Sequence, residues 1–137
     1  MTRRVAVDTG PLIALFDRSD VDHAAAVRFF AHFRERGFVT TAVIAEVTHL
    51  LSYHSQAPVD FLRWLQSGAL EIEEIASDLQ RVVALMVKYA DLPMDFADAT
   101  IVAGCERLGI RDIATLDSDF VIYRYKDRQV FHNLFPA

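Results

Sequence analysis

The stretch VAVDTGPL, residues 5–12, decides the fold that we expect for this chain. Its first three residues, Val5–Val7, form an apolar run of the kind found in short strands buried on both faces of a parallel sheet. The run ends at Asp8, after which Thr-Gly-Pro is expected to turn the chain. Pro11 suits the first turn of a helix, so we predict a short helix directly after the strand. Strand, carboxylate and helix in immediate succession indicate an α/β fold.

Strand and helix signals alternate along the rest of the chain. Further strands are predicted at 38–40, 70–75, 112–116 and 129–135, and further helices at 22–36, 41–54, 58–68, 77–90 and 95–108. This alternation predicts a three-layer α/β/α sandwich with a mainly parallel sheet of about five strands. The helix over 41–54 is apolar nearly all round, so we expect it to be largely buried. Without a repeat or linker, residues 1–137 are expected to form one domain.

Composition and charge exclude several classes of protein. Apolar residues make up 53% of the chain, which argues against disorder. Apolar runs fall short of the ~20 residues of a membrane span, and the one near the N-terminus is too short for a signal peptide. A lone cysteine, Cys105, excludes a disulfide framework and a cysteine-based zinc cluster. We therefore expect a cytoplasmic protein without a membrane partner.

Four carboxylates fall at positions that call for an explanation. Asp8 and Asp117 follow two predicted strands, and ligands of open parallel sheets bind at such strand ends. The two carboxylates meet at one edge if their strands are neighbours. Glu46 lies on the apolar stripe of its helix, with no Lys or Arg between residues 38 and 62 to pair with it. Asp98 likewise shares a helix face with apolar residues.

Some of these acids also have a purely structural explanation. Asp95 is a good N-cap, and Asp98 suits the first turn of the same helix through the helix dipole or a capping box. Asp119 is expected to be a solvated turn residue that could reach the rim of a site. Capping does not explain Glu46, because it lies in the middle of its helix.

If these carboxylates converge, either some are protonated or a cation lies among them, since like charges disfavour one another. Oxygen ligands without a His or Cys pattern suit Mg²⁺ or Mn²⁺. Acidic metal sites of this kind serve phosphoryl transfer and nucleic-acid cleavage. The net charge of −5 argues against binding of nucleic acid by bulk charge, but a metal would neutralise part of it.

The order of the motifs resembles a known family. The chain carries DT at 8–9, AEV at 45–47, DA at 98–99 and TLDSDF at 115–120. In this order and spacing it resembles the PIN domain over about residues 4–135, and most of all the toxin ribonucleases of bacterial VapBC toxin–antitoxin pairs. The resemblance implies a Mg²⁺- or Mn²⁺-dependent endoribonuclease acting on RNA. It also implies homodimers and a small antitoxin protein that blocks the site.

Carried over residue by residue, the resemblance assigns roles to individual side chains. It assigns catalysis and metal binding to an acidic quartet: Asp8, Glu46, Asp98 and Asp117. It assigns supporting contacts around the quartet to three further residues: Thr9, Asp95 and Asp119. The hydroxyl of Thr9 would hydrogen-bond a carboxylate or a bound water. We expect water to attack the phosphodiester in line and to leave a 5′-phosphate and a 3′-hydroxyl.

RNA must still approach a protein with more acids than bases. Subtracting the quartet from 19 acidic residues leaves 15 against 14 basic ones, so the remainder is nearly neutral. Four basic residues are predicted to contact phosphates: Arg18, Arg124, Lys126 and Arg128. Tyr123 and Tyr125, in the same segment as the last three, are available for stacking on bases. A solvated turn beside a strand explains this segment equally well.

Two other functions fit parts of the pattern. A phosphotransfer receiver domain is also a small α/β sheet with an acidic pocket. In this chain, however, Asp8 has no acidic neighbour, and a receiver leaves Glu46 and Asp98 unexplained. A non-catalytic PIN-like module for RNA binding or assembly is the second alternative, but such modules often lose the acids, and all four are present here. The sequence therefore favours an active ribonuclease.

Overall fold

The apolar strand at the start of the chain lies at the centre of the sheet. The computed structural model describes residues 3–136. β1, Arg4–Val7, pairs with β2, Arg36–Thr40, on one side and with β4, Asp112–Ala114, on the other. Its three apolar residues are fully or almost fully buried. A strand can be apolar on both faces because helices cover both sides of such a sheet.

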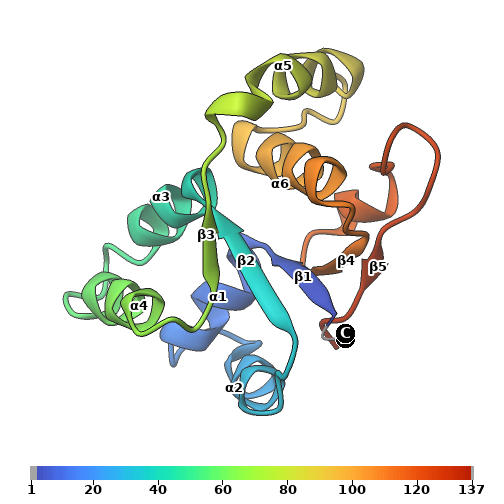
Figure 1. Cartoon of the computed structure of the whole chain (residues 1–137). Coiled ribbons are helices and arrows are strands. Elements are labelled where there is room, and N and C mark those ends of the chain that lie inside the picture. The colour runs from blue at the N-terminus through green and yellow to red at the C-terminus, as the bar shows by residue number, and fades with distance from the viewer. Residues whose placement is uncertain (1–2, 137) are drawn as a thin grey trace.

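The structure has the predicted three-layer α/β/α architecture, with a sheet that is parallel throughout. Two short strands, β3 at Glu71–Glu73 and β5 at His132–Asn133, form its edges, so the strand order is β3-β2-β1-β4-β5. The helices are α1 at Thr9–Phe16, α2 at His23–Ala31, α3 at Thr41–Leu50, α4 at Ala57–Gln66, α5 at Leu79–Lys88 and α6 at Phe96–Leu108. Two short 3₁₀ turns complete the described structure: η1, at Ala76–Asp78, precedes α5, and η2, at Ser118–Val121, follows β4. Figure 1 shows α1 and α2 on one side of the sheet and α5 and α6 on the other.

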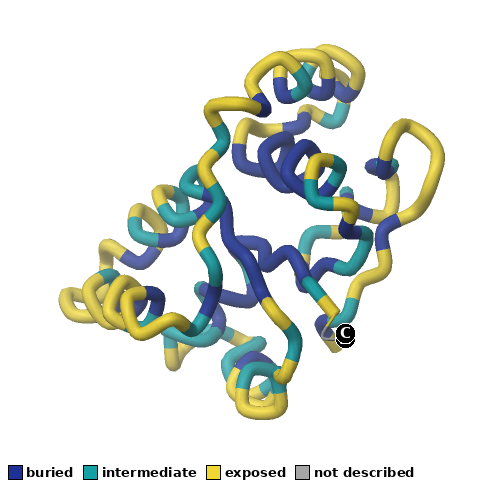
Figure 2. The backbone as a smooth tube through the Cα atoms, viewed as in Figure 1, coloured by how far each residue is buried: buried dark blue, intermediate teal, exposed yellow. Residues whose placement is uncertain are grey.

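The deeply buried helix is α6 and not α3, so the predicted burial of the helix over 41–54 is wrong. Every residue of α6 from Ala97 to Cys105 is buried, and Figure 2 shows this helix as dark as the central strands. In α3, Val43 is buried, whereas Leu50 is 47% exposed. Alanines and a glycine let α6 lie close to the sheet: a Cβ on Gly104 would stand 3.6 Å from the ring of Phe38 in β2.

Gly37 lies inside β2 and does not end a helix, contrary to the prediction of a helix over 22–36. The helix α2 already ends at Ala31. A Cβ on Gly37 would lie 2.5 Å from Cδ2 of Leu70 and 3.0 Å from Cε2 of Phe33. A Cβ at this position would force the side chains of Leu70 and Phe33 to shift, so close packing and not a turn favours glycine here. None of the helices within residues 3–136 combines the length and the apolar composition that a membrane crossing requires.

Candidate metal centre

Asp8 is held at the carboxyl end of β1 through both of its carboxylate oxygens. Its Oδ1 accepts a hydrogen bond from the backbone N of Thr9 at 2.7 Å, so Thr-Gly-Pro is the first turn of α1 and not a separate turn. Its Oδ2 accepts from Oγ1 of Thr115 at 2.7 Å. The backbone N of Asp8 donates to the carbonyl of Ala114, which extends the pairing of β1 with β4. The side chain is thus buried, 4% exposed, and fixed in orientation.

Thr115 connects Asp8 to Asp117. Its Oγ1 accepts from the backbone N of Asp117 at 2.9 Å while donating to Asp8. The side-chain amide of Asn133 in β5 bonds both the backbone N and the backbone O of Thr115, at 3.1 Å each. Asp117 itself caps η2, since its Oδ1 accepts from the backbone N of Asp119. The edge strand therefore helps to hold the segment that carries the second carboxylate.

Replacing Thr115 with valine is expected to lower the free energy of unfolding by about 1–3 kcal/mol, because buried Asp8 loses a donor and the backbone N of Asp117 loses its acceptor. Denaturant unfolding at pH 8 measures the change. Thr48→Val is the matched control, because the Thr48 hydroxyl bonds carbonyls of its own helix, and a shift within about 0.5 kcal/mol is expected there. Equal effects of both substitutions would contradict a bridging role for Thr115.

Asp98 approaches the same point from the other side, in the first turn of α6. Its backbone N donates to Oδ1 of the N-cap residue Asp95 at 2.8 Å. Its Oδ2 accepts from the hydroxyl of Tyr123 at 3.2 Å, and that tyrosine is fully buried. One carboxylate oxygen from each of Asp8, Asp98 and Asp117 lies within 4.8 Å of the other two. Three separate segments thus bring three carboxylates to one point.

Burial makes ionisation of these carboxylates unfavourable. Burial is the largest of the effects that raise the pKa of Asp8 to about 6, and repulsion by Asp117 and Glu46 raises it further. It also raises the pKa of Asp98 to about 8, with the charge of Asp95 as the next cause. A group bearing positive charge among them would relieve this repulsion and restore the ionised forms.

The donor set fits a hard divalent cation. The carboxylates face a cavity of about 270 Å³ lined by Asp8, Thr9, Gly10, Glu46, Asp95, Asp98, Leu116 and Asp117. The hydroxyl of Thr9, a residue that lines this cavity, is buried and makes no hydrogen bond to any residue in the range 3–136. A wall of oxygen ligands without nitrogen or sulfur suits Mg²⁺ or Mn²⁺.

The structure places the remaining predicted acids at different distances from this point. Glu46 lines the cavity from α3 and is half-buried, although the tight cluster of oxygens belongs to the other three acids. Asp95 also lines the cavity while it caps α6. Asp119 contributes its backbone N to Asp117 and, within the described residues, does not line the cavity.

Among residues 3–136, the basic residues predicted to contact RNA do not line this cavity. Nη1 of Arg124 donates to the carbonyls of residues 121–123, which holds the guanidinium against its own backbone. Lys126 and Arg128 are exposed on the turn that follows. Arg18 lines a separate hollow beside Asp17 and His54.

Tyr123 and Tyr125 are both buried, and Tyr125 lines a shallow hollow together with Lys126 and Arg128. Tyr123 serves the candidate site through its hydroxyl. Sequence reasoning missed this role, because no local signal shows that its hydroxyl reaches Asp98. It also missed Thr115, whose position two residues before Asp117 was the available signal.

Comparison with known proteins identifies relatives with this fold. The PIN domain family model matches residues 5–126. Ribonuclease VapC26 of Mycobacterium tuberculosis is 32% identical over 114 residues, which cover 81% of this chain and 84% of that protein. The structure of VapC20 from the same species, a toxin that cleaves the sarcin–ricin loop, superposes with a TM-score of 0.77 at 24% identity, covering 84% of this chain and 91% of that one. A toxin–antitoxin complex from Klebsiella pneumoniae superposes with a TM-score of 0.64 at 21% identity, covering 85% and 89%.

Proposed function

Because the chain belongs to the PIN domain family, we propose that it is a metal-dependent endoribonuclease of the VapC toxin type. The observation that carries the proposal is the meeting of Asp8, Asp98 and Asp117, whose oxygens lie within 4.8 Å of one another at the carboxyl edge of the sheet. A relative at 32% identity is itself a ribonuclease. The substrate that we propose is RNA.

Asp8, Asp98 and Asp117 would hold Mg²⁺ or Mn²⁺ in this mechanism. When bound, the ion supplies the Lewis acidity that activates water and stabilises negative charge on the phosphate. Contacts around the carboxylates keep them in place: Thr115 donates to Asp8, and Tyr123 donates to Asp98.

Glu46 has a separate role in this proposal. Its carboxylate lies on the α3 side of the cavity, is less buried than Asp8 and is therefore accessible to solvent. We assign it the positioning of the attacking water and the acceptance of a proton from it. Attack in line with the leaving 3′-oxygen would break the P–O3′ bond, and the 3′-oxygen would take up a proton from solvent, which gives a 5′-phosphate and a 3′-hydroxyl.

The proposal also includes protein partners. The Klebsiella pneumoniae relative is found in a toxin–antitoxin complex, and we propose an antitoxin that blocks the cavity of this chain in the cytoplasm. We also propose a homodimer. Support comes from an exposed apolar stripe along α5, formed by Leu79, Val83 and Val87 at successive turns of the helix.

Removal of metal tests the proposed reaction. Defined RNAs are expected to be cleaved in the presence of Mg²⁺ or Mn²⁺, to remain intact when EDTA is added, and to be cleaved again when the metal is restored in excess. End-group analysis should find 5′-phosphates. Equal cleavage in EDTA would contradict the metal-dependent mechanism. RNA binding without cleavage, and without metal binding in calorimetry, would support the non-catalytic module instead.

A further inference from the structure

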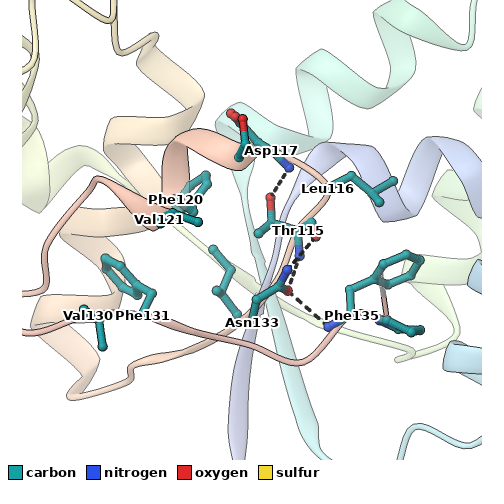
Figure 3. A pocket seen from close by; sticks show the side chains of 12 residues that line it. Thr115, Leu116, Asp117, Phe120, Val121, Val130, Phe131, Asn133 and Phe135 are labelled. Atoms are coloured by element: carbon teal, nitrogen blue, oxygen red, sulfur yellow. Dashed lines mark hydrogen bonds between the residues drawn. The ribbon is translucent and has the colours of Figure 1, made fainter.

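A second cavity, of about 310 Å³, opens beside the acidic site on the side of β5 (Figure 3). Its walls include the buried rings of Phe120, Phe131 and Phe135. Val121 and Val130 also line it and are 75% and 49% exposed, which places them at its mouth. Its volume lies at the lower end of the ~300–1,000 Å³ typical of ligand pockets. A cavity of this size and lining suits one flat, apolar group.

This aromatic pocket lies next to the acidic site and shares a wall with it. Leu116 and Asp117 line both cavities, and Asp117 is one of the three clustered carboxylates. The shared wall is held rigidly, because Thr115 is bonded to Asp8, to Asp117 and to Asn133. A phosphate engaged at Asp117 is joined to each neighbouring base by a single sugar. A base next to that phosphate can therefore reach the pocket.

We propose that the aromatic pocket receives the nucleobase of one of the two nucleotides that flank the scissile phosphate. The proposal rests on the RNA cleavage proposed above and adds a subsite to it. Bases are flat and bind aromatic and apolar surfaces through stacking and burial. The pocket presents Phe120 and Phe131 in edge-to-face contact, with ring centroids 6.1 Å apart, so the aromatic surface is already formed.

The charges of the pocket favour a base over a phosphate or an acidic peptide. None of the described residues that line it is Lys or Arg, and its one ionisable side chain is the carboxylate of Asp117. The amide of Asn133 is largely occupied: Oδ1 accepts from the backbone N of Thr115 and of Phe135, and Nδ2 uses one of its two N–H groups on the carbonyl of Thr115. The second N–H of Asn133 and the hydroxyl of Ser118 are the neutral side-chain donors that remain among the described lining residues, so the pocket offers few groups for reading the edge of a base. The presence of a base should matter more than its identity.

Abasic RNA tests this inference. In an RNA with a mapped cleavage position, the base is removed from the nucleotide on either side of the scissile bond. The wild type is expected to cleave one of the two abasic RNAs with about tenfold lower kcat/KM and the other like intact RNA. Val130→Asp places a carboxylate at the mouth of the pocket. This variant is expected to lower kcat/KM on intact RNA about tenfold. On the abasic RNA that the wild type cleaves more slowly, it is expected to cause little further decrease in kcat/KM.

Matched variants separate this effect from general damage. Val27→Asp makes the same change on the exposed face of α2, where Val27 is 43% exposed, and is expected to cleave every RNA like the wild type. Val121→Asp, at the same mouth, should reproduce the effect of Val130→Asp, and melting temperatures show that each variant is folded. Equal cleavage of intact RNA and of both abasic RNAs by the wild type would overturn the proposal. So would wild-type cleavage by Val130→Asp on every RNA, the result expected if the pocket serves a protein partner. Failure of metal-dependent cleavage on all RNAs would instead contradict the proposed function, and this inference with it.

Discussion

Asp98→Asn is expected to lower RNA cleavage by about 10²-fold or more while raising the melting temperature of the metal-free protein at pH 8. The amide oxygen can still accept the hydrogen bond from Tyr123, so the local structure should be kept. The charge that would hold a metal is lost, and with it the stabilisation of the reacting phosphate. Folding no longer has to bury a carboxylate whose pKa is raised to about 8. Opposite changes in activity and stability are characteristic of groups retained for function.

Cleavage assays and thermal unfolding on the same preparation measure both effects. Asp60→Asn is the control, because Asp60 is an exposed residue of α4 and is not among the described residues that line the cavity, so neither property should change with it. Unaltered cleavage by Asp98→Asn would remove Asp98 from the metal ligands. A fall in both activity and stability would show that the side chain is structural.

The metal-free protein is expected to lose stability as the pH rises from 4 to 8 and to regain it when Mn²⁺ is added. The ordinary pKa of these carboxyl groups is 3.8, and in the folded chain it is about 6 for Asp8 and about 8 for Asp98. Between these values the folded state binds more protons than the unfolded state, so rising pH favours unfolding. The loss from pH 5 to pH 8 should be about 2–4 kcal/mol, after screening at the open side of the site. A metal ion that binds the folded carboxylates opposes the loss by mass action.

Denaturant unfolding in chelator at a series of pH values, with and without Mn²⁺, measures this dependence. The double variant Asp8→Asn, Asp98→Asn is the control, because it removes both titrating groups. Its stability should vary much less over the same range and should not respond to Mn²⁺. An equally steep pH dependence in the double variant would show that other groups are responsible.

The layer architecture was predictable because local patterns alone determine it. A buried strand reads as an apolar run, as in Val5–Val7, and helix signals between strands require a parallel sheet. Helix burial was not predictable in the same way. Apolar composition suggested that α3 is buried, but close approach to the sheet depends on side-chain size, and the small residues of α6 allow it. Gly37 was assigned to a helix end for a similar reason, since the close neighbours that favour glycine there include Leu70, which is distant in the sequence.

The candidate site was partly predictable for a related reason. Asp8 and Asp117 could be placed because strand ends in a parallel sheet share one edge, and Asp98 because it was an awkward residue on an apolar helix face. The structure brings these three together. Thr115 and Tyr123 orient these carboxylates through hydrogen bonds to Asp8 and Asp98, which lie far from them in the sequence, so the local sequence does not reveal those contacts.

The distance along the chain between the clustered carboxylates has a consequence for biosynthesis. Thr115 and Asp8, joined by a hydrogen bond, are 107 positions apart, and β1 cannot pair with β4 until both have been made. A nascent chain that is still attached to a ribosome lacks Asp117 until most of this domain has been translated. Contacts of such long range also form late in folding. A chain that cleaves RNA would thus remain harmless to its own messenger and ribosome for most of its synthesis.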